Sequence, residues 1–313
     1  MVLIPQKSIV QEDPPKPAKE TLPTMYDLPS EDSEEPGLPD EFHDLQPQLL
    51  SRTLRLTDYP GEHCFTASDL NLYYDVKHPL WHKRPDWFLV VDVPRLYEGT
   101  DLRRSYVIWQ EGKSPDVVIE FLSPGTESED LGRFGDETKN DTSDVSEAVN
   151  GGNGDKSIVP VSGRLTRPKP PGKVEVYEQY LRVPHYIVYS RYTQQLRYFK
   201  LDGGQYREQP LAAENPRLWL ADLGMGLGIW EGVFEGISSP WLRWCDRDGN
   251  WQLTDTEQAQ LEKEQAQLEK EQAQTQLRQA AQNLLATGME ASQVTQILGL
   301  SAAQVQAFLL NDE

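Results

Sequence analysis

Cysteine, basic residues and long apolar runs are all scarce in this 313-residue sequence. Its two cysteines, Cys64 and Cys245, lie far apart with no CxxC pair or His/Cys cluster beside them, which argues against a disulfide framework or a zinc site. No eighteen apolar residues follow one another, and the N-terminus lacks a basic region followed by an apolar run. We therefore expect no membrane segment and no export signal, and a location in the cytoplasm.

Several widespread catalytic motifs are missing as well. The sequence contains no GxSxG, no HExxH, no P-loop and no GxGxxG after a predicted strand. The glycine-rich stretch at residues 224–232 lacks the following helix that a phosphate cradle requires. His78 and His82 are four residues apart, but Pro79 between them prevents the regular helix that would place both on one face. These absences argue against serine-hydrolase, zinc-protease and nucleotide-binding chemistry.

Acidic residues outnumber basic ones by 50 to 30, which gives a formal net charge of −20. Such a balance at first argues against a nucleic-acid partner, because phosphate binding normally needs a basic surface. Three segments, residues 1–41, 126–157 and 257–313, carry −18 of this charge. The remainder is close to neutral, so charge neither supports nor excludes DNA binding by the central part of the chain.

Composition divides the chain into four parts. Residues 1–35 are rich in proline and acid, and we expect a disordered lead-in there. Residues 36–245 have the patterns of one folded domain, with a polar, glycine-rich stretch at 126–172 that we interpret as a flexible insertion. Residues 246–282 are predicted to be a charged helical spacer, and residues 283–313 a small helix-turn-helix-like element.

Within the folded domain, the spacing of Phe42 and Leu49 predicts a helix that Pro47 should strain or split. Near-continuous apolar runs are typical of strands buried on both faces of a sheet. Such runs occur at residues 70–76, 87–93, 105–109 and 116–122. A short amphipathic helix is predicted after Lys173, and Asp-Gly-Gly at 202–204 predicts a tight hairpin. This order predicts an α/β fold, with a mixed β-sheet core flanked by helices and followed by a C-terminal helical extension.

The heptapeptide repeat EQAQLEK at residues 257–277 consists of strong helix formers. Each repeat has one leucine and one alanine two positions apart, which gives no a/d seam, so a solvated single helix is predicted. Two more helices should follow, joined at Gly299 and capped by Ser301. No lysine or arginine follows Arg278, which argues against major-groove reading and favours a packing or protein-interaction element.

Three positions suit metal-dependent phosphodiester hydrolysis. Asp86 begins an apolar strand, Glu120 lies inside the apolar run DVVIEFL, and Lys173 opens a helix. One or two carboxylates can hold Mg²⁺ together with waters and substrate phosphate, and a lysine can orient water and offset negative charge. Glu120 is the most informative, because an ionised glutamate in a buried strand needs a cation or a partner. An aspartate at a strand entrance is more commonly a turn residue, and we interpret Asp116 in this way.

The segments around these positions resemble a known family. RPDWFLVV, SPDVVIEFLSPGTESEDLG and KVEVYEQYLRVPHYIVY resemble, in order, the PD strand, the glutamate strand and the K-x-x-x-Y segment of the Uma-type restriction endonucleases. This bacterial family belongs to the PD-(D/E)XK nuclease superfamily, and the resemblance covers residues 25–245 approximately. It implies a restriction-endonuclease-like fold, Mg²⁺ or Mn²⁺ as cofactor and DNA as substrate, with a homodimer as a frequent assembly in the superfamily.

The resemblance also implies roles for individual residues. Asp86 would be the aspartate of the PD motif and Glu120 the acid of the (D/E)xK motif, both as metal ligands. The residue two after Glu120 is Leu122, which departs from the literal motif. Within the family the lysine has moved to the following helix, so Lys173 would take its catalytic role.

A further carboxylate is implied on the first predicted helix. Glu41 matches the helical acid of the superfamily, and Asp40 and Asp44 are neighbouring alternatives.

Two functions remain open from the sequence. The first is a Mg²⁺-dependent DNA endonuclease that uses Asp86, Glu120 and Lys173, with Glu41 as a further catalytic acid. The second is a catalytically inactive nuclease fold that acts as a binding or regulatory module, because a fold does not fix a function. In that case the acidic insertion and the C-terminal helices would engage a protein partner.

Overall fold

The computed structural model describes residues 40–123, 125–135 and 169–310. The chain divides into two compact units, Met1–Gln252 and Leu253–Glu313. The lead-in predicted at residues 1–35 lies outside the described residues, and so does most of the insertion predicted at 126–172.

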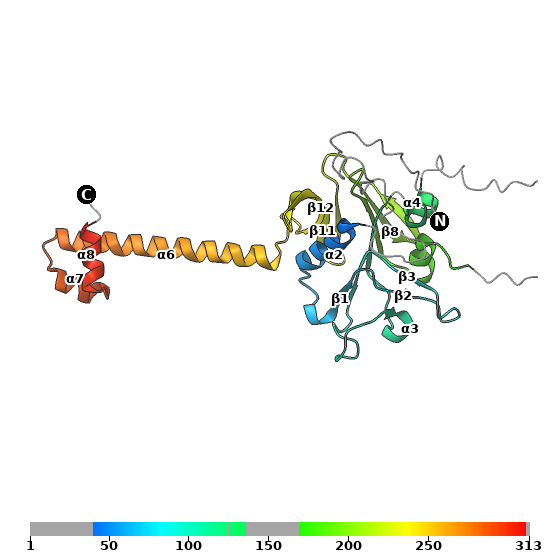
Figure 1. Cartoon of the computed structure of the whole chain (residues 1–313), viewed down its shortest axis with the longest axis horizontal. Helices are drawn as coiled ribbons and strands as arrows, with labels where there is room; N and C mark the ends of the chain where they lie inside the picture. Colours follow the sequence, from blue (N-terminus) through cyan, green and yellow to red (C-terminus); the bar gives the residue numbers. More distant parts are fainter. Residues whose placement is uncertain (1–39, 124, 136–168, 311–313) are drawn as a thin grey trace, which may run out of the picture. The chain divides into compact units, whose positions relative to one another are not determined.

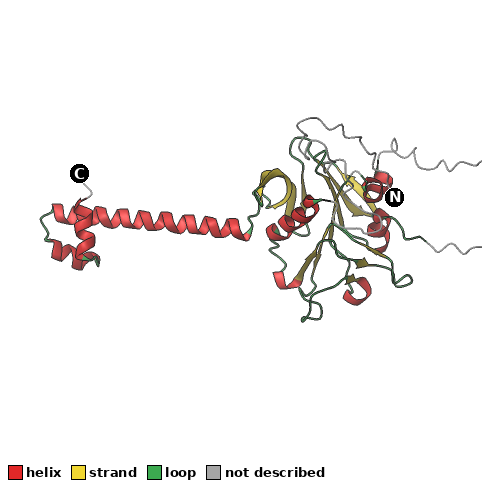
Figure 2. Ribbon diagram, in the orientation of Figure 1, coloured by secondary structure: helices red, strands yellow, loops and turns green. Residues whose placement is uncertain are grey.

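A six-stranded sheet forms the centre of the first unit (Figures 1 and 2), with the strand order β1-β4-β6-β7-β8-β9. The strands are β1 (Cys64–Ala67), β4 (Trp87–Val91), β6 (Val117–Phe121), β7 (His185–Ser190), β8 (Gln195–Asp202) and β9 (Gln205–Gln209). Neighbours are antiparallel except β6 and β7, which are parallel. The predicted mixed sheet is therefore confirmed.

The three central strands β4, β6 and β7 are buried at every residue. Alternate side chains enter two separate cores: Trp87 and Leu89 point into one, and Phe88 and Val90 into the other. This alternation follows from the two-residue period of a strand. The near-continuous apolar runs of the sequence thus mark strands that are covered on both faces.

The first core lies between this sheet, the helix α2 (Glu41–Thr53) and a second sheet. The second sheet contains β10 (Arg217–Leu220), β11 (Met225–Phe234) and β12 (Ile237–Cys245), all antiparallel. Pro47 was predicted to strain or split this helix, and the split is excluded, because α2 runs unbroken through it. Proline removes one donated hydrogen bond, and the burial of Phe42, Leu49 and Leu50 offsets that loss.

Short helices and a small sheet cover the other face. They are α4 (Glu127–Leu131), the 3₁₀ turn η2 (Gly132–Phe134), α5 (Lys173–Glu175) and the π-helical turn η4 (Val176–Tyr180). The small sheet has the order β3-β2-β5, with β2 (Leu72–Tyr73), β3 (His82–Lys83) and β5 (Tyr106–Val107). The remaining short elements are the 3₁₀ turn η1 (Gly61–His63) and α3 (Ile108–Glu111).

Some local predictions needed correction on this face. The strand predicted at 70–76 is only two residues long, and the one predicted at 105–109 turns into α3 after Val107. Residues 127–134, which were included in the flexible insertion, are helical. The hairpin predicted at Asp-Gly-Gly is confirmed: Gly203 and Gly204 have φ of +59° and +86°, and β8 pairs with β9 around them.

The second unit begins with α6 (Asp255–Ala286), whose N-terminus carries a capping box of Thr254 and Glu257. Leu261 and Leu268 are exposed, as a solvated single helix predicts. Glutamine–glutamate pairs four residues apart support the helix. They are Gln258–Glu262, Gln260–Glu264, Gln265–Glu269 and Gln267–Glu271.

At the end of α6 pack α7 (Ala291–Leu298) and α8 (Ala302–Leu310), as Figure 1 shows. The predicted turn and cap are confirmed, since Gly299 has φ of +65° and Ser301 Oγ accepts from Gln304 N. Among the described residues, no helix combines the length and apolarity needed to cross a bilayer.

The buried Gln46 joins α2 to β12 and gives a first prediction. Its amide donates to Leu242 O and accepts from Leu242 N, both at 2.8 Å. The substitution Gln46→Met keeps the volume but leaves both backbone groups unpaired, and should lower the free energy of unfolding by about 2–5 kcal/mol.

All eight tryptophans precede residue 253, so tryptophan fluorescence during urea denaturation follows the first unit alone. The control Gln48→Met, on the outer side of the same helix, should change the free energy by no more than about 0.5 kcal/mol. Equal losses in the two variants would contradict the role given to Gln46.

Candidate active site

Glu120 is the centre of a polar cluster inside the first unit. It lies on the central strand β6 and its side chain is 0% exposed. Its Oε1 accepts a hydrogen bond from the Tyr177 hydroxyl at 2.7 Å. Its Oε2 accepts from Lys173 Nζ at 3.1 Å and from Asp86 N at 3.2 Å. Both carboxylate oxygens are therefore held by partners from other elements.

Lys173 stands between two buried acids. Besides Glu120, its Nζ lies 2.7 Å from Oδ1 of Asp130, a buried residue of α4. Lys173 is the first residue of α5, and Tyr177 follows four residues later. The helical spacing places both side chains on one face, toward Glu120. The turn η4 keeps this orientation through a bond from Leu181 N to Val176 O at 2.9 Å.

Asp86 completes the cluster from the entrance of β4. The antiparallel register pairs Trp87 with Ile119, so Asp86 lies opposite Glu120. Its Oδ2 accepts from Phe121 N at 2.5 Å. For Oδ1, no hydrogen bond occurs within the described part of the chain, and the side chain is only half-buried. Asp86 thus offers one carboxylate oxygen at the border between the cluster and solvent.

The cluster carries more negative than positive charge. Burial raises the pKa of Asp86, and raises that of Glu120 well above its usual value, although Lys173 opposes both shifts. Burial also disfavours the charge of Lys173, but the carboxylates of Glu120 and Asp130 outweigh it and raise the pKa of Lys173. Three acids around one permanently charged lysine form a site that an additional cation would stabilise.

His43 of α2 supplies positive charge beside the cluster. Its Nδ1 lies 2.7 Å from Asp40 Oδ1, and its Nε2 lies 3.0 Å from Phe121 O. An ionised carboxylate and a carbonyl can only accept hydrogen bonds, so both ring nitrogens carry protons. Burial opposes this charge, while the hydrogen bond to Asp40 and the field of Asp86 raise the pKa of His43.

The structure brings together three of the four residues singled out from the sequence: Asp86, Glu120 and Lys173. It does not bring Glu41 to them, because Glu41 is exposed in the first turn of α2. The assignment of Glu41 to the site therefore stays a prediction without a contact to support it. Two residues along a helix correspond to a rotation of about 200°, so the buried His43 and Glu41 face different directions.

The other acids considered in the sequence lie elsewhere. Asp44 is exposed and accepts from Gln48, whereas Asp40 reaches the cluster only through His43. Asp116 sits at the opposite end of β6, where its Oδ2 accepts from Val91 N at 2.9 Å. This is the structural role expected for it.

The sequence analysis missed Asp130, Tyr177 and His43. For Tyr177 a signal existed, since it stands one helical turn after Lys173 in the K-x-x-x-Y segment. Asp130 is one of three acids in ESEDL, and nothing in the spacing separates it from the other two. No local pattern marks His43, because its partner Phe121 is 78 residues away.

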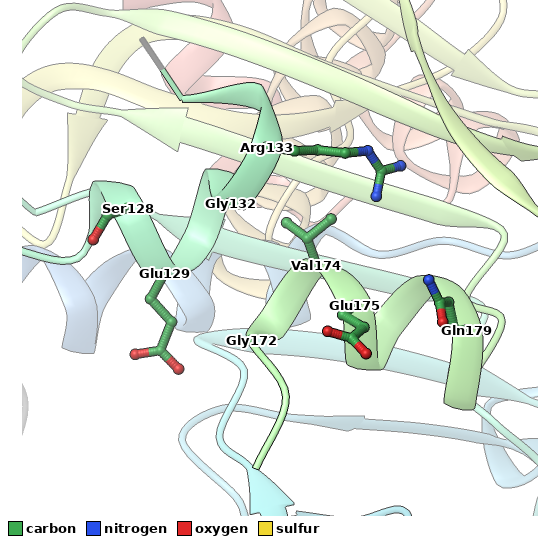
Figure 3. A pocket seen from close by; sticks show the side chains of 8 residues that line it. All are labelled: Ser128, Glu129, Gly132, Arg133, Gly172, Val174, Glu175 and Gln179. Atoms are coloured by element: carbon green, nitrogen blue, oxygen red, sulfur yellow. The ribbon is translucent and has the colours of Figure 1, made fainter. Parts of the chain in front are cut away.

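A cavity of about 270 Å³ lies beside α4 and α5 (Figure 3). Glu129 and Val174, which are chain neighbours of Asp130 and Lys173, line it together with Arg133. Asp130 and Lys173 do not line it, because they point to the opposite side of their helices, toward Glu120. The cavity is therefore adjacent to the cluster but separate from it.

The donor set fits a magnesium-type cation better than zinc. Among the described residues, no three His, Cys, Asp or Glu side chains are arranged to hold a metal together. Mg²⁺ commonly takes one or two protein carboxylates and fills its shell with water and phosphate oxygens. Asp86, with its free Oδ1, and the neighbouring Glu120 meet that requirement.

The electrostatics give a second prediction. Folding raises the pKa of the Glu120 carboxyl above its usual value of 4.5. The protonated carboxyl therefore stabilises the folded state at low pH, and this contribution is lost as the pH rises from 4.5 through the raised pKa. At pH 8, the free energy of unfolding of Glu120→Gln should therefore be at least that of the unmodified protein. The difference in free energy of unfolding, variant minus unmodified protein, should increase from pH 5 to pH 8.

Lys173→Met should instead lower the free energy of unfolding by about 3–5 kcal/mol, since it leaves buried carboxylates without their cation. Urea denaturation followed by tryptophan fluorescence measures both variants. An equal loss in Glu120→Gln and Lys173→Met at pH 8 would contradict this account of the cluster.

The comparison with known families agrees with the geometry. The model of the Uma2 family, described as "putative restriction endonuclease", matches residues 20–233, which contain every residue of the cluster. No curated protein matches the chain. The mixed sheet with flanking helices and C-terminal helices is consistent with a restriction-endonuclease-like fold. Since the match covers more than half of the 313 residues, the chain belongs to the Uma2 family.

Proposed function

We propose that this chain is a divalent-metal-dependent endonuclease that hydrolyses phosphodiester bonds of DNA. The observation that carries the proposal is the convergence of Asp86, Glu120 and Lys173, from three separate elements, in one acidic cluster. Family membership supports the same reaction class, because the family is described by restriction endonuclease activity and such enzymes act on DNA.

Asp86 and Glu120 would hold Mg²⁺ or Mn²⁺, and Asp86 Oδ1 accepts no hydrogen bond within the described part of the chain. When bound, the ion would polarise the phosphate and lower the pKa of a bound water. Tyr177 donates to Glu120 Oε1 and so fixes the direction of this carboxylate. The peptide N–H of Phe121 does the same for Asp86. The two carboxylates are thus oriented before any ion arrives.

Lys173 would act as a cation and hydrogen-bond donor. Its raised pKa keeps the ammonium protonated, so it is unsuited to accept a proton from water. It can instead orient the attacking water or offset the charge that develops on the phosphate. Asp130 holds the ammonium from the side away from Glu120 and is therefore a positioning residue for Lys173.

Cleavage of supercoiled and linear DNA by the purified chain tests the proposal and gives a third prediction. With Mg²⁺ or Mn²⁺ the protein should nick or cut DNA, and EDTA should abolish the reaction. Asp86→Asn and Lys173→Ala should each lower the rate by about 10²–10³, as removal of one charge-stabilising group typically does.

Glu214→Gln is the matched control, because it removes an exposed acid of the same unit and should leave the rate unchanged. Cleavage that persists in Asp86→Asn and Lys173→Ala would overturn the proposal. An absence of cleavage with any DNA would favour the alternative, an inactive nuclease fold that serves as a binding module. In that case truncation of residues 253–313 should abolish capture of a protein partner.

A further inference from the structure

The hairpin formed by β2 and β3 presents apolar side chains to solvent. Its connecting loop, residues 74–81, projects from the body of the first unit (Figure 1). Val76 is 64% exposed and Leu80 is 81% exposed, the highest value among the large apolar side chains described as exposed. Pro79 beside Leu80 is exposed as well. We call residues 72–83 the site hairpin.

The tip of the site hairpin is organised before it meets any partner. Asp75 Oδ1 accepts from Lys77 N at 2.8 Å, and Asp75 Oδ2 lies 2.7 Å from His78 Nδ1. The rings of His78 and Trp81 stack at 3.8 Å, and Trp81 N donates to His78 O at 2.8 Å. A preformed tip loses less conformational freedom on binding, so its exposed side chains are suited to recognition.

Two contacts and a short stretch of chain link the site hairpin to residues that neighbour the cluster. Lys83 Nζ lies 2.9 Å from Glu129, the residue before Asp130. The ring of Tyr74 meets that of Tyr180, the last residue of η4, at 5.4 Å. The chain then continues from Lys83 to Asp86 within three residues. The base of the site hairpin therefore leads directly to the segments that carry the groups proposed to cut DNA.

The charge of this segment is opposite to that of the whole chain. Residues 75–84 contain three cations and one acid, in a protein of net charge −20. Lys83 and Arg84 form ion pairs with Glu129 and Asp69. Lys77 is exposed, and within the described part of the chain no carboxylate pairs with its ammonium.

We propose that the site hairpin binds duplex DNA, with Leu80 and Pro79 wedged against the base steps of the minor groove and Lys77 on a phosphate. Apolar wedges flanked by cations are the means by which proteins enter that groove. The exposed cation Lys77 at the tip and the three-residue link from Lys83 to Asp86 favour a nucleic acid over a lipid surface. The inference deepens the proposed function, since it assigns the contact that positions the substrate at the cluster.

The test measures binding and cleavage separately. Binding of a fluorescent 30-base-pair duplex is measured by anisotropy with the full chain carrying Asp86→Asn, at two salt concentrations. Adding Leu80→Ser should weaken binding by about tenfold at both concentrations, and Lys77→Gln should reduce the slope of log K against log salt by about one. In the active chain both substitutions should raise KM more than they lower kcat.

Val233→Ser and Lys200→Gln are matched controls, because both residues are exposed on strands outside the site hairpin. Neither control should change binding. Duplex affinity unaffected by Leu80→Ser and Lys77→Gln would overturn the inference, even if the protein cleaves DNA. Binding to phosphatidylserine vesicles that Leu80→Ser abolishes, with unchanged duplex binding, would also overturn it. Hairpin-dependent duplex binding without cleavage would support the inference and reject only the nuclease function.

Discussion

The rest of this structure depends on one ammonium group placed between buried carboxylates. Lys173 contacts Glu120 of the central strand and Asp130 of the crossover that connects β6 with the parallel strand β7. Without the lysine, these acids and Asp86 would repel one another in a region of low dielectric. The position of α5 on the sheet is therefore fixed by charge as much as by the apolar contacts of Tyr177. The same arrangement gathers three carboxyl groups around a single ammonium.

A second constraint acts through the peptide unit of Phe121. Its N–H donates to Asp86, and its carbonyl accepts from the imidazolium of His43. His43 is held by Asp40, which in turn pairs with Arg191 after β7 at 2.8 Å. This series of contacts ties α2 and the ends of β6 and β7 to the same aspartate. The half-buried Asp86 is thus anchored through its Oδ2.

Residues of the cluster could be predicted from the sequence where a local pattern marks them. Glu120 was found because an acid interrupts an apolar strand, and Lys173 because it opens a recognisable segment. Asp130 and His43 were missed, since their partners are 43 and 78 residues away and no spacing rule connects them. The strands were predicted from their apolar runs, whereas the unbroken α2 was not, because packing overrides the local penalty of a proline. Contacts between residues far apart in the sequence therefore explain why Asp130 and His43 were not predicted and why the continuity of α2 was not predicted.

The contact between Asp130 and Lys173 also closes a loop of the chain. Forty-two residues separate the two. The entropy of closing a loop grows only with the logarithm of its length, about 0.6 kcal/mol for each doubling. The entropic cost of closing this loop therefore changes little with the number of residues between Asp130 and Lys173. A change in that number would leave the contact between the two side chains, and the cluster it supports, in place.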